Sequence, residues 1–314
     1  MRLELQNIHK HFGDHHVLRG LSFFADSGRA FGLLGRNGAG KTTTLRILMD
    51  VFPADDGKVL IDGAPINYAK TGIGYLPEER GLYPKKTIID QLSYFAQLHG
   101  MKRAEAVKSI DYWLDRLEMT EHRNKRLDTL SKGNQQKIQL VTALAHNPEI
   151  VILDEPFSGL DPVNAQLLKD IVREEISRGK IVLFSSHQMN YIEEFCDAIA
   201  ILHGGEIVLK GDLADIKHNY PRNKLVVRSI QDADKIRETY ADRIIPHAFE
   251  SAEHKNDLML RLQDPSEKEQ IMRDLTGRFA IDGVMVFEPS LNDIFVEYAS
   301  EDTGAEATNA EVKS

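Results

Sequence analysis

The chain has 314 residues, of which 42% are hydrophobic and 28% charged, and its formal net charge is -9. This length is enough for one large domain or two, each with a sizeable hydrophobic core. The acidic balance argues against nucleic acid as the main partner, because proteins that bind the phosphate backbone carry a basic face.

Strands and helices are expected to alternate through about the first 220 residues. The N-terminal segment predicts two strands joined by a turn at Gly13 and Asp14. A short apolar strand at 30–34 leads into a glycine-rich loop, and the loop leads into a helix. This alternation indicates an α/β domain with a largely parallel sheet. Further strands are expected near 58–63, 73–77, 149–156, 180–187 and 198–205, and helices over 88–117, after 131–135, near 163–178 and over 189–196.

The character of the sequence changes near Pro221, where a polar cluster suggests a boundary. Beyond it, short strands and helices recur and predict a small α+β unit. The last residues are small, polar and acidic, and they predict a disordered tail. We therefore expect a first domain over 1–220, a small α+β domain over 221–300, and the tail over 301–314.

The segment GRNGAGKT has the spacing of a phosphate-binding loop between a strand and a helix. Its glycines let backbone N–H groups converge on phosphate oxygens, and the helix directs its positive end at the same anion. We expect Lys41 to reach the β- and γ-phosphates, Thr42 to ligate Mg²⁺ and Thr43 to bond the α-phosphate. A chance match in a chain of this length occurs at roughly the 1% level. The other loop residues predicted to bind the nucleotide are Gly35, Arg36, Asn37, Gly38, Ala39 and Gly40.

Three side chains at the ends of buried strands are candidates for binding magnesium, activating water and contacting the γ-phosphate. Asp154 and Glu155 follow one apolar strand, and His187 follows another. Because the carboxyl ends of parallel strands face the ligand crevice, Asp154 is expected to hold magnesium through water and Glu155 to polarise the attacking water. His187 is expected to touch the γ-phosphate. The alternative is that Asp154 and Glu155 form an ordinary solvated strand end and that His187 has a structural role only.

These motifs together resemble the ATP-binding subunit of ABC transporters, over about residues 1–220. LSKGNQQK at 130–137 is similar to the signature segment of that family, and DEPFSGLDP at 154–162 to its second phosphate-site strand and the loop that crosses the dimer. SSH ends on the switch histidine, and Phe12 stands where the family stacks an aromatic ring on adenine. The resemblance implies a P-loop NTPase fold of the ABC type. Its parts are a mainly parallel core sheet, an antiparallel β subdomain, a helical subdomain and the small α+β domain.

The resemblance also implies a head-to-tail dimer with a second ATP-binding subunit, either a copy or a paralogue. Ser131, Gly133 and Asp161 are then expected to contact ATP across the interface. Lys132 and Asn134 depart from the usual signature, which has Gly and Gln there. A further departure is at Glu78, which stands where the family places a glutamine that ligates magnesium. Glu78 offers an oxygen to the metal and adds a negative charge.

The C-terminal unit resembles, more loosely, the accessory domain of bacterial exporter ATPases of the sodium and drug efflux group, through PSLNDIFVEYAS from Pro289. This implies a polytopic permease as partner, contacted by the segment from Glu78 to about His99, although a packed helical subdomain explains that segment equally well. The single cysteine, Cys196, favours a reducing compartment. The sequence shows neither a signal peptide nor a membrane span. We expect a cytoplasmic protein, peripheral at the inner face of the cell membrane.

Two other functions compete with a transport ATPase. A soluble ABC-type ATPase acting on ribosomes or DNA is one, although ribosome-acting relatives carry two ATP domains and DNA-repair relatives a long coiled coil. A nucleotide-binding regulatory module without turnover is the other, and the intact set of Lys41, Asp154, Glu155 and His187 argues against it. A metal site is not favoured at the N-terminal histidines, because no carboxylate or cysteine framework completes one; these are His9, His11, His15 and His16.

Overall fold

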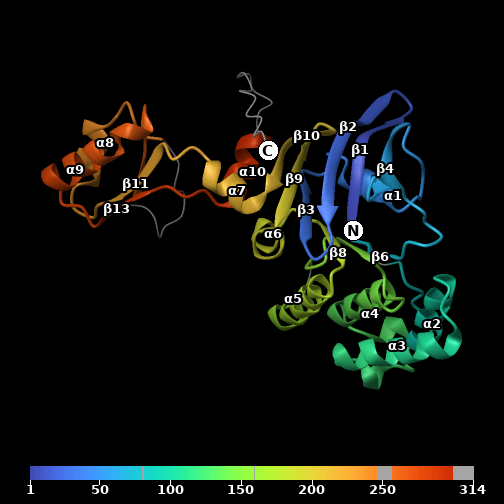
Figure 1. The fold of residues 1–314 in the computed structure, drawn as a ribbon. Coiled ribbons are helices and arrows are strands. Elements are labelled where there is room, and N and C mark those ends of the chain that lie inside the picture. The colour runs from blue at the N-terminus through green and yellow to red at the C-terminus, as the bar shows by residue number, and fades with distance from the viewer. Residues whose placement is uncertain (80, 159, 246–256, 300–314) are drawn as a thin grey trace. The chain divides into compact units, whose positions relative to one another are not determined.

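The chain forms two compact units in the computed structural model (Figure 1). The first unit contains Met1–Ala214 and also the segment that begins at Leu291, whereas the second unit is Asp215–Ser290. This division differs from the boundary expected at residue 220, and it assigns the C-terminal helix to the first unit. The expected tail lies outside the described residues, which are 1–79, 81–158, 160–245 and 257–299.

An antiparallel sheet of four strands forms one layer of the first unit, in the order β2-β1-β4-β5. The edge strand β2 and its neighbour β1 form the predicted N-terminal hairpin, in which Phe12 pairs with His15 across the turn. Alternate residues such as Leu3 and Leu5 are fully buried, because one face of the sheet covers the core. The strands are β1 (Arg2–Phe12), β2 (His15–Asp26), β4 (Asp56–Ile61) and β5 (Ala64–Pro65).

A second sheet has six strands in the order β10-β9-β3-β8-β7-β6. All of its neighbours are parallel except the pair of β9 and β10, which is antiparallel. The central strands β3, β7 and β8 are buried along their whole length, as strands with both faces covered must be. The strands are β3 (Ala30–Gly35), β6 (Ile73–Leu76), β7 (Ile150–Asp154), β8 (Ile181–Ser185), β9 (Ala198–His203) and β10 (Glu206–Asp212).

The hydrophobic core of the first unit joins the two sheets through α1 (Lys41–Leu48). Helix α10 (Leu291–Ala299) packs on β9 and on α6 (Met189–Phe195). Leu291 and Ile294 are fully buried in that contact region, and the backbone N–H of Leu291 donates to Oε1 of Glu193 at 2.7 Å. The C-terminal helix is therefore a part of the first unit although the second unit precedes it in the chain.

Three helices form the helical subdomain, and Figure 1 shows them grouped apart from β1, β2 and β4. The expected helix over 88–117 is divided in two by Gly100, whose φ of 85° is unfavourable for other residues. Helix α4 approaches β6 closely, since a Cβ at Gly74 would lie 2.1 Å from the carbonyl oxygen of Ala143. The helices are α2 (Ile88–Leu98), α3 (Arg103–Arg116) and α4 (Lys132–Leu144), with short 3-10 turns at Thr120–His122 and Leu127–Thr129.

The second unit contains a three-stranded antiparallel sheet in the order β12-β11-β13. Its core includes the fully buried Leu225, Val227 and Ile236. This α+β arrangement agrees with the elements expected beyond Pro221. The elements are α7 (Leu213–Asn219), which crosses the boundary, β11 (Lys224–Arg228), α8 (Ala233–Thr239), β12 (Asp257–Arg261), a 3-10 turn (Pro265–Glu267), α9 (Lys268–Arg278) and β13 (Gly283–Val286).

The strand order and the helical group confirm the expected fold class. Strands β5 and β10 and helices α7 and α10 were not predicted, and none of them is longer than nine residues. Within the described ranges, no helix is long and apolar enough to cross a membrane.

A stacked pair of histidines, the partly buried His146 after α4 and the exposed His99 after α2, lies beside the start of β6. His146 stacks on His99 with ring centroids 3.8 Å apart, and its Nε2 lies 3.1 Å from the carbonyl oxygen of Ile73. Burial, with a smaller effect of His99, lowers the pKa of His146 to about 4. His146 is therefore neutral in the folded protein at pH values where an unfolded chain, with a pKa of about 6.5, already takes up a proton.

We expect this histidine to make stability depend on pH. The pKa of His146 is lower in the folded protein than in the unfolded chain. The contribution of neutral His146 to the free energy of unfolding is therefore complete above about pH 6.5 and is lost as the pH falls toward 4. The loss is on the order of 2 kcal/mol, which corresponds to a fall of several degrees in the melting temperature. Melting temperatures at pH 7.5 and 5.5 should differ less in His146→Gln than in the wild type. The matched change of the exposed His15→Gln should leave the difference unaltered; an unaltered difference in His146→Gln would contradict the assignment.

Candidate functional site

The glycine-rich loop after β3 is packed so closely that its glycines are required. Gly40 has a φ of 109°, and a Cβ there would lie 2.6 Å from Cδ2 of Leu18. A Cβ at Gly35 would lie 2.8 Å from the carbonyl oxygen of Leu202. The loop therefore approaches β2 and β9 at distances that a side chain would prevent.

Helix α1 begins at Lys41 without a side-chain cap, because its N-cap residue is Gly40. The first N–H groups of a helix have no partner within the helix, so this end is suited to a phosphate group. The Nζ atom of Lys41 donates to the carbonyl oxygens of Gly35, at 2.6 Å, and Arg36, at 3.3 Å. Burial lowers the pKa of Lys41, and the charges of Glu155, Asp154 and Glu78 oppose that effect by favouring the cation.

Asp154 ends β7 and is 4% exposed. Its carboxylate accepts a hydrogen bond from the Tyr75 hydroxyl at 3.3 Å, across the parallel pair of β6 and β7. Burial raises the pKa of Asp154, and the neighbouring charges of Glu78 and Glu155 act in the same direction. A carboxylate in such surroundings is stabilised by a cation, whether an ammonium group or a metal ion.

Glu155 is held on both of its carboxylate oxygens. Oε1 lies 2.8 Å from the backbone N of His187 and 2.6 Å from its ring Nδ1, and Oε2 accepts from the Ser186 hydroxyl at 2.9 Å. The Glu155 side chain is 5% exposed, whereas that of His187 is 60% exposed. The carboxylate is thus fixed at the wall of the pocket, while the imidazole projects into it.

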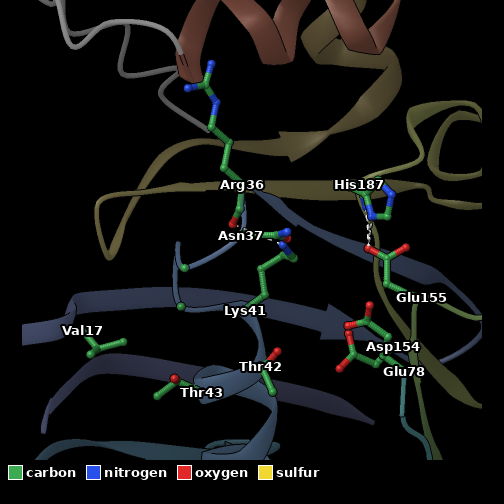
Figure 2. Close-up of a pocket in the computed structure, with 12 residues that line it drawn as sticks. Val17, Arg36, Asn37, Lys41, Thr42, Thr43, Glu78, Asp154, Glu155 and His187 are labelled. Carbon is green, nitrogen blue, oxygen red and sulfur yellow. Dashed lines mark hydrogen bonds and ion pairs between the residues drawn. The ribbon is translucent and has the colours of Figure 1, made fainter. Parts of the chain in front are cut away.

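These residues enclose a cavity of about 410 Å³ (Figure 2). The figure shows the three carboxylates on one side and Lys41, Thr42 and Thr43 on the side of the loop and α1. Val17 of β2 also lines the cavity, and no motif indicated it, because its position depends on the approach of β2 to the loop. The predicted site residues that line the cavity are Arg36, Asn37, Gly38, Gly40, Lys41, Thr42, Thr43, Glu78, Asp154, Glu155 and His187.

The remaining predicted site residues lie elsewhere. Phe12 is 51% exposed and packs edge-to-face on Phe52, with centroids 5.6 Å apart. Gly35 and Ala39 belong to the loop but do not line the cavity. Ser131, Gly133 and Asp161 also lie outside it, at the starts of two helices.

The starts of α4 and α5 (Pro162–Ser177) lie next to each other. The Ser131 hydroxyl caps α4 by accepting from the backbone N of Asn134 at 3.3 Å, and Asp161 caps α5 by accepting from the backbone N of Asn164 at 3.0 Å. A Cβ at Gly133 would lie 3.2 Å from the side-chain Nδ2 of Asn164. The two capped helix starts thus lie together on a part of the first unit that does not line the cavity.

The cavity offers the hard oxygen ligands that magnesium prefers. The Thr42 hydroxyl and the carboxylates of Glu78 and Asp154 all line it, beside the loop that is built for phosphate. The donor set therefore fits Mg²⁺. Among the residues that the structure describes, no group of three or more His, Cys, Asp or Glu side chains is placed to hold a metal ion by protein ligands alone. A metal at this site would thus share its ligands with a bound nucleotide.

Two family models match the chain. The one described as "ABC transporter" matches residues 18–158, which include the loop, β7 and Glu155. The one described as "ATP-binding protein DrrA1-3-like, C-terminal domain" matches residues 211–299.

Individual relatives extend over nearly the whole chain. A Bacillus subtilis ABC transporter ATP-binding protein, YhaQ, described as uncharacterized, is 42% identical over 94% of this chain and 97% of its own length. The Nod factor export ATP-binding protein I of Rhizobium etli is 30% identical over 94% of this chain and 92% of its own length. Among solved structures, an ATP-binding subunit of an ABC transporter matches 70% of this chain and 93% of its own, at 29% identity and a TM-score of 0.64.

Proposed function

The chain belongs to the ATP-binding, ATP-hydrolysing subunits of ABC transporters, and from this premise we propose that it energises a separate membrane permease that exports its cargo. The observation that carries the proposal is the cavity itself, in which a phosphate loop faces Glu155 and His187. The similarity to a Nod factor export protein and to the DrrA-like C-terminal domain supports the direction of transport. Sodium, drugs and similar compounds are the proposed class of cargo.

We propose the following roles in hydrolysis. The loop N–H groups and Lys41 bind the β- and γ-phosphates, and Phe12 stacks on adenine. Glu155 takes the proton from the attacking water, whose oxygen bonds to the γ-phosphorus as the bond to the ADP oxygen breaks. His187, which projects into the cavity, holds the γ-phosphate in position.

Thr42, Asp154 and Glu78 would hold Mg²⁺ together with the nucleotide, and the ion would neutralise part of the charge of the phosphates. The chain positions the oxygens of these three side chains around the loop. Hydrogen bonds between α4 and the segment after β6 support the position of Glu78. The Gln139 Nε2 donates to the carbonyl oxygens of Pro77 at 3.2 Å and of Glu79 at 3.0 Å. These bonds fix the backbone on both sides of Glu78.

We propose that the site becomes complete in a head-to-tail dimer with a copy or a paralogue. Support comes from the adjacent starts of α4 and α5, which offer Ser131, Gly133 and Asp161 to a nucleotide bound by the other subunit. Binding of ATP would then close the dimer and hydrolysis would reopen it, and the motion would pass to the permease. The protein would lie peripherally at the inner face of the cell membrane.

The proposed permease contact is the exposed apolar surface around α2. Tyr94 is 51% exposed and Leu98 is 65% exposed, and Tyr83, which is 52% exposed, stacks on Phe95 with centroids 6.1 Å apart. Exposed aromatic and aliphatic side chains gathered on one element are typical of protein interfaces.

Isolation of the full chain from its own membranes in mild detergent tests the proposal. We expect a polytopic membrane protein to accompany it in stoichiometric amount, and recovery only with ribosomes or DNA would contradict the transport function. Leu98→Asp is expected to reduce this recovery at least about tenfold, because a charge is then buried in the contact. Val51→Asp is the matched control, since Val51 is 62% exposed and follows α1, outside the segment proposed to contact the permease.

A further inference from the structure

The hydroxyl of Ser186 contacts the carboxylate of Glu155 from the turn after β8. Ser186 is 2% exposed, and its Oγ donates to Oε2 of Glu155 at 2.9 Å. The same Oγ accepts a hydrogen bond from the backbone N–H of Gln188 at 3.0 Å. A buried hydroxyl between one donor and one acceptor is a positioned group and not a rotating one.

The direction of this hydroxyl is set by its second contact. A serine hydroxyl has one hydrogen, and the N–H of Gln188 occupies one of its lone pairs. The hydrogen is therefore directed at Glu155. A hydrogen bond to an ionised carboxylate is about twice as strong as one between neutral groups.

The backbone of Glu155 is fixed by the same strand. Glu155 has a φ of 49°, in the left-handed region that is uncommon for glutamate, and its N–H donates to the carbonyl oxygen of Ser185 at 2.8 Å. Such a conformation persists where its surroundings hold it. The segment Ser185–His187 thus determines both the backbone and the side-chain position of Glu155.

The two carboxylate oxygens are held by different groups. His187 contacts only Oε1, through its backbone N–H and the Nδ1 atom of its exposed ring, and a turn of the ring that moves Nδ1 toward a γ-phosphate would break the ring contact. Ser186 contacts Oε2, and its contact does not depend on the position of the ring. We propose that Ser186 is a positioning residue that keeps Glu155 aligned with the attacking water while His187 binds phosphate. This inference rests on the proposed role of Glu155 as the base.

Ser186→Ala removes this contact with little change of volume. We expect kcat for ATP hydrolysis to fall about tenfold, with the KM and Kd for ATP changed less than about twofold, because the lost hydrogen bond acts on the base and not on the bound nucleotide. Ser186→Thr retains the hydroxyl and is expected to stay within about threefold of the wild-type kcat. Ser109→Ala is the matched control, since its Oγ donates to the carbonyl oxygen of Ala145 far from the cavity.

A double variant separates positioning from a general structural effect. In a Glu155→Gln background, Ser186→Ala should change the residual single-turnover rate less than about twofold, because the group on which it acts is already gone. A second tenfold loss in the double variant, or a wild-type kcat in Ser186→Ala, would overturn the inference. Wild-type turnover in Glu155→Gln alone would instead overturn the proposed base, so the two failures are distinguishable.

Discussion

Glu155→Gln is expected to reduce steady-state ATP hydrolysis by about 100-fold or more while ATP binding is retained. Glutamine has the size of glutamate but does not accept a proton from water, and general-base catalysis contributes roughly 10²- to 10⁴-fold. The pocket tolerates the change, because the amide still accepts from His187 on one side. The γ-phosphate would then remain uncleaved.

The same variant is expected to accumulate an ATP-loaded dimer. Hydrolysis is the proposed step that reopens the dimer, so a slow variant should elute at twice the monomer mass in the presence of ATP and Mg²⁺. Turnover, nucleotide binding and size-exclusion chromatography measure the three effects. Glu206→Gln, which removes an exposed carboxylate from β10, should behave like the wild type in all of them. Hydrolysis by Glu155→Gln at the wild-type rate would show that another group is the base.

Lys41→Ala is expected to weaken ATP binding by about 100-fold or more. Lys41 is 9% exposed and supplies a positive charge opposite three carboxylates, so its loss leaves the negative wall to repel the phosphates. A factor of 100 corresponds to about 2.7 kcal/mol in binding free energy. Titration with a fluorescent ATP analogue measures the effect.

Two further variants control for packing and for net charge. Lys41→Met keeps most of the side-chain length and should lose binding to the same extent, since the charge and not the stem is required. Lys70→Ala removes an exposed cation outside the cavity and should bind normally. Normal affinity in Lys41→Ala would contradict the predicted phosphate site.

Local motifs predicted most of the pocket lining because their chemistry is contained in a few consecutive residues. The loop from Gly35 to Thr42 requires glycines wherever its backbone approaches phosphate, so the sequence alone indicates it. Asp154 and His187 were identifiable because each follows a buried parallel strand, and such strands end at a common edge. The roles assigned to these side chains remain predictions.

Other features depend on packing between distant segments. Val17 lines the cavity because Leu18, its neighbour, fills the space beside Gly40, and no short pattern encodes that contact. The segment from Leu291 was recognised only by its resemblance to the accessory domain, and neither its helix nor the surface of β9 and α6 on which it packs was predicted. The division of the expected helix at Gly100 was not predicted, because the apolar residues before and after this glycine fit a single helical period.

Because α10 belongs to the first unit, the second unit is inserted into the sequence of the first unit and does not simply follow it. A truncation at Ser290 would remove Leu291 and Ile294 from the ATPase unit along with the tail, and each buried side chain of this kind contributes about 1.5–3 kcal/mol. Excision of Asp215–Ser290 with religation of the ends, as is done for inserted domains, would instead keep that helix. The ATPase unit is therefore assembled from two separate stretches of sequence, and it is complete only after the ribosome has synthesised the inserted domain.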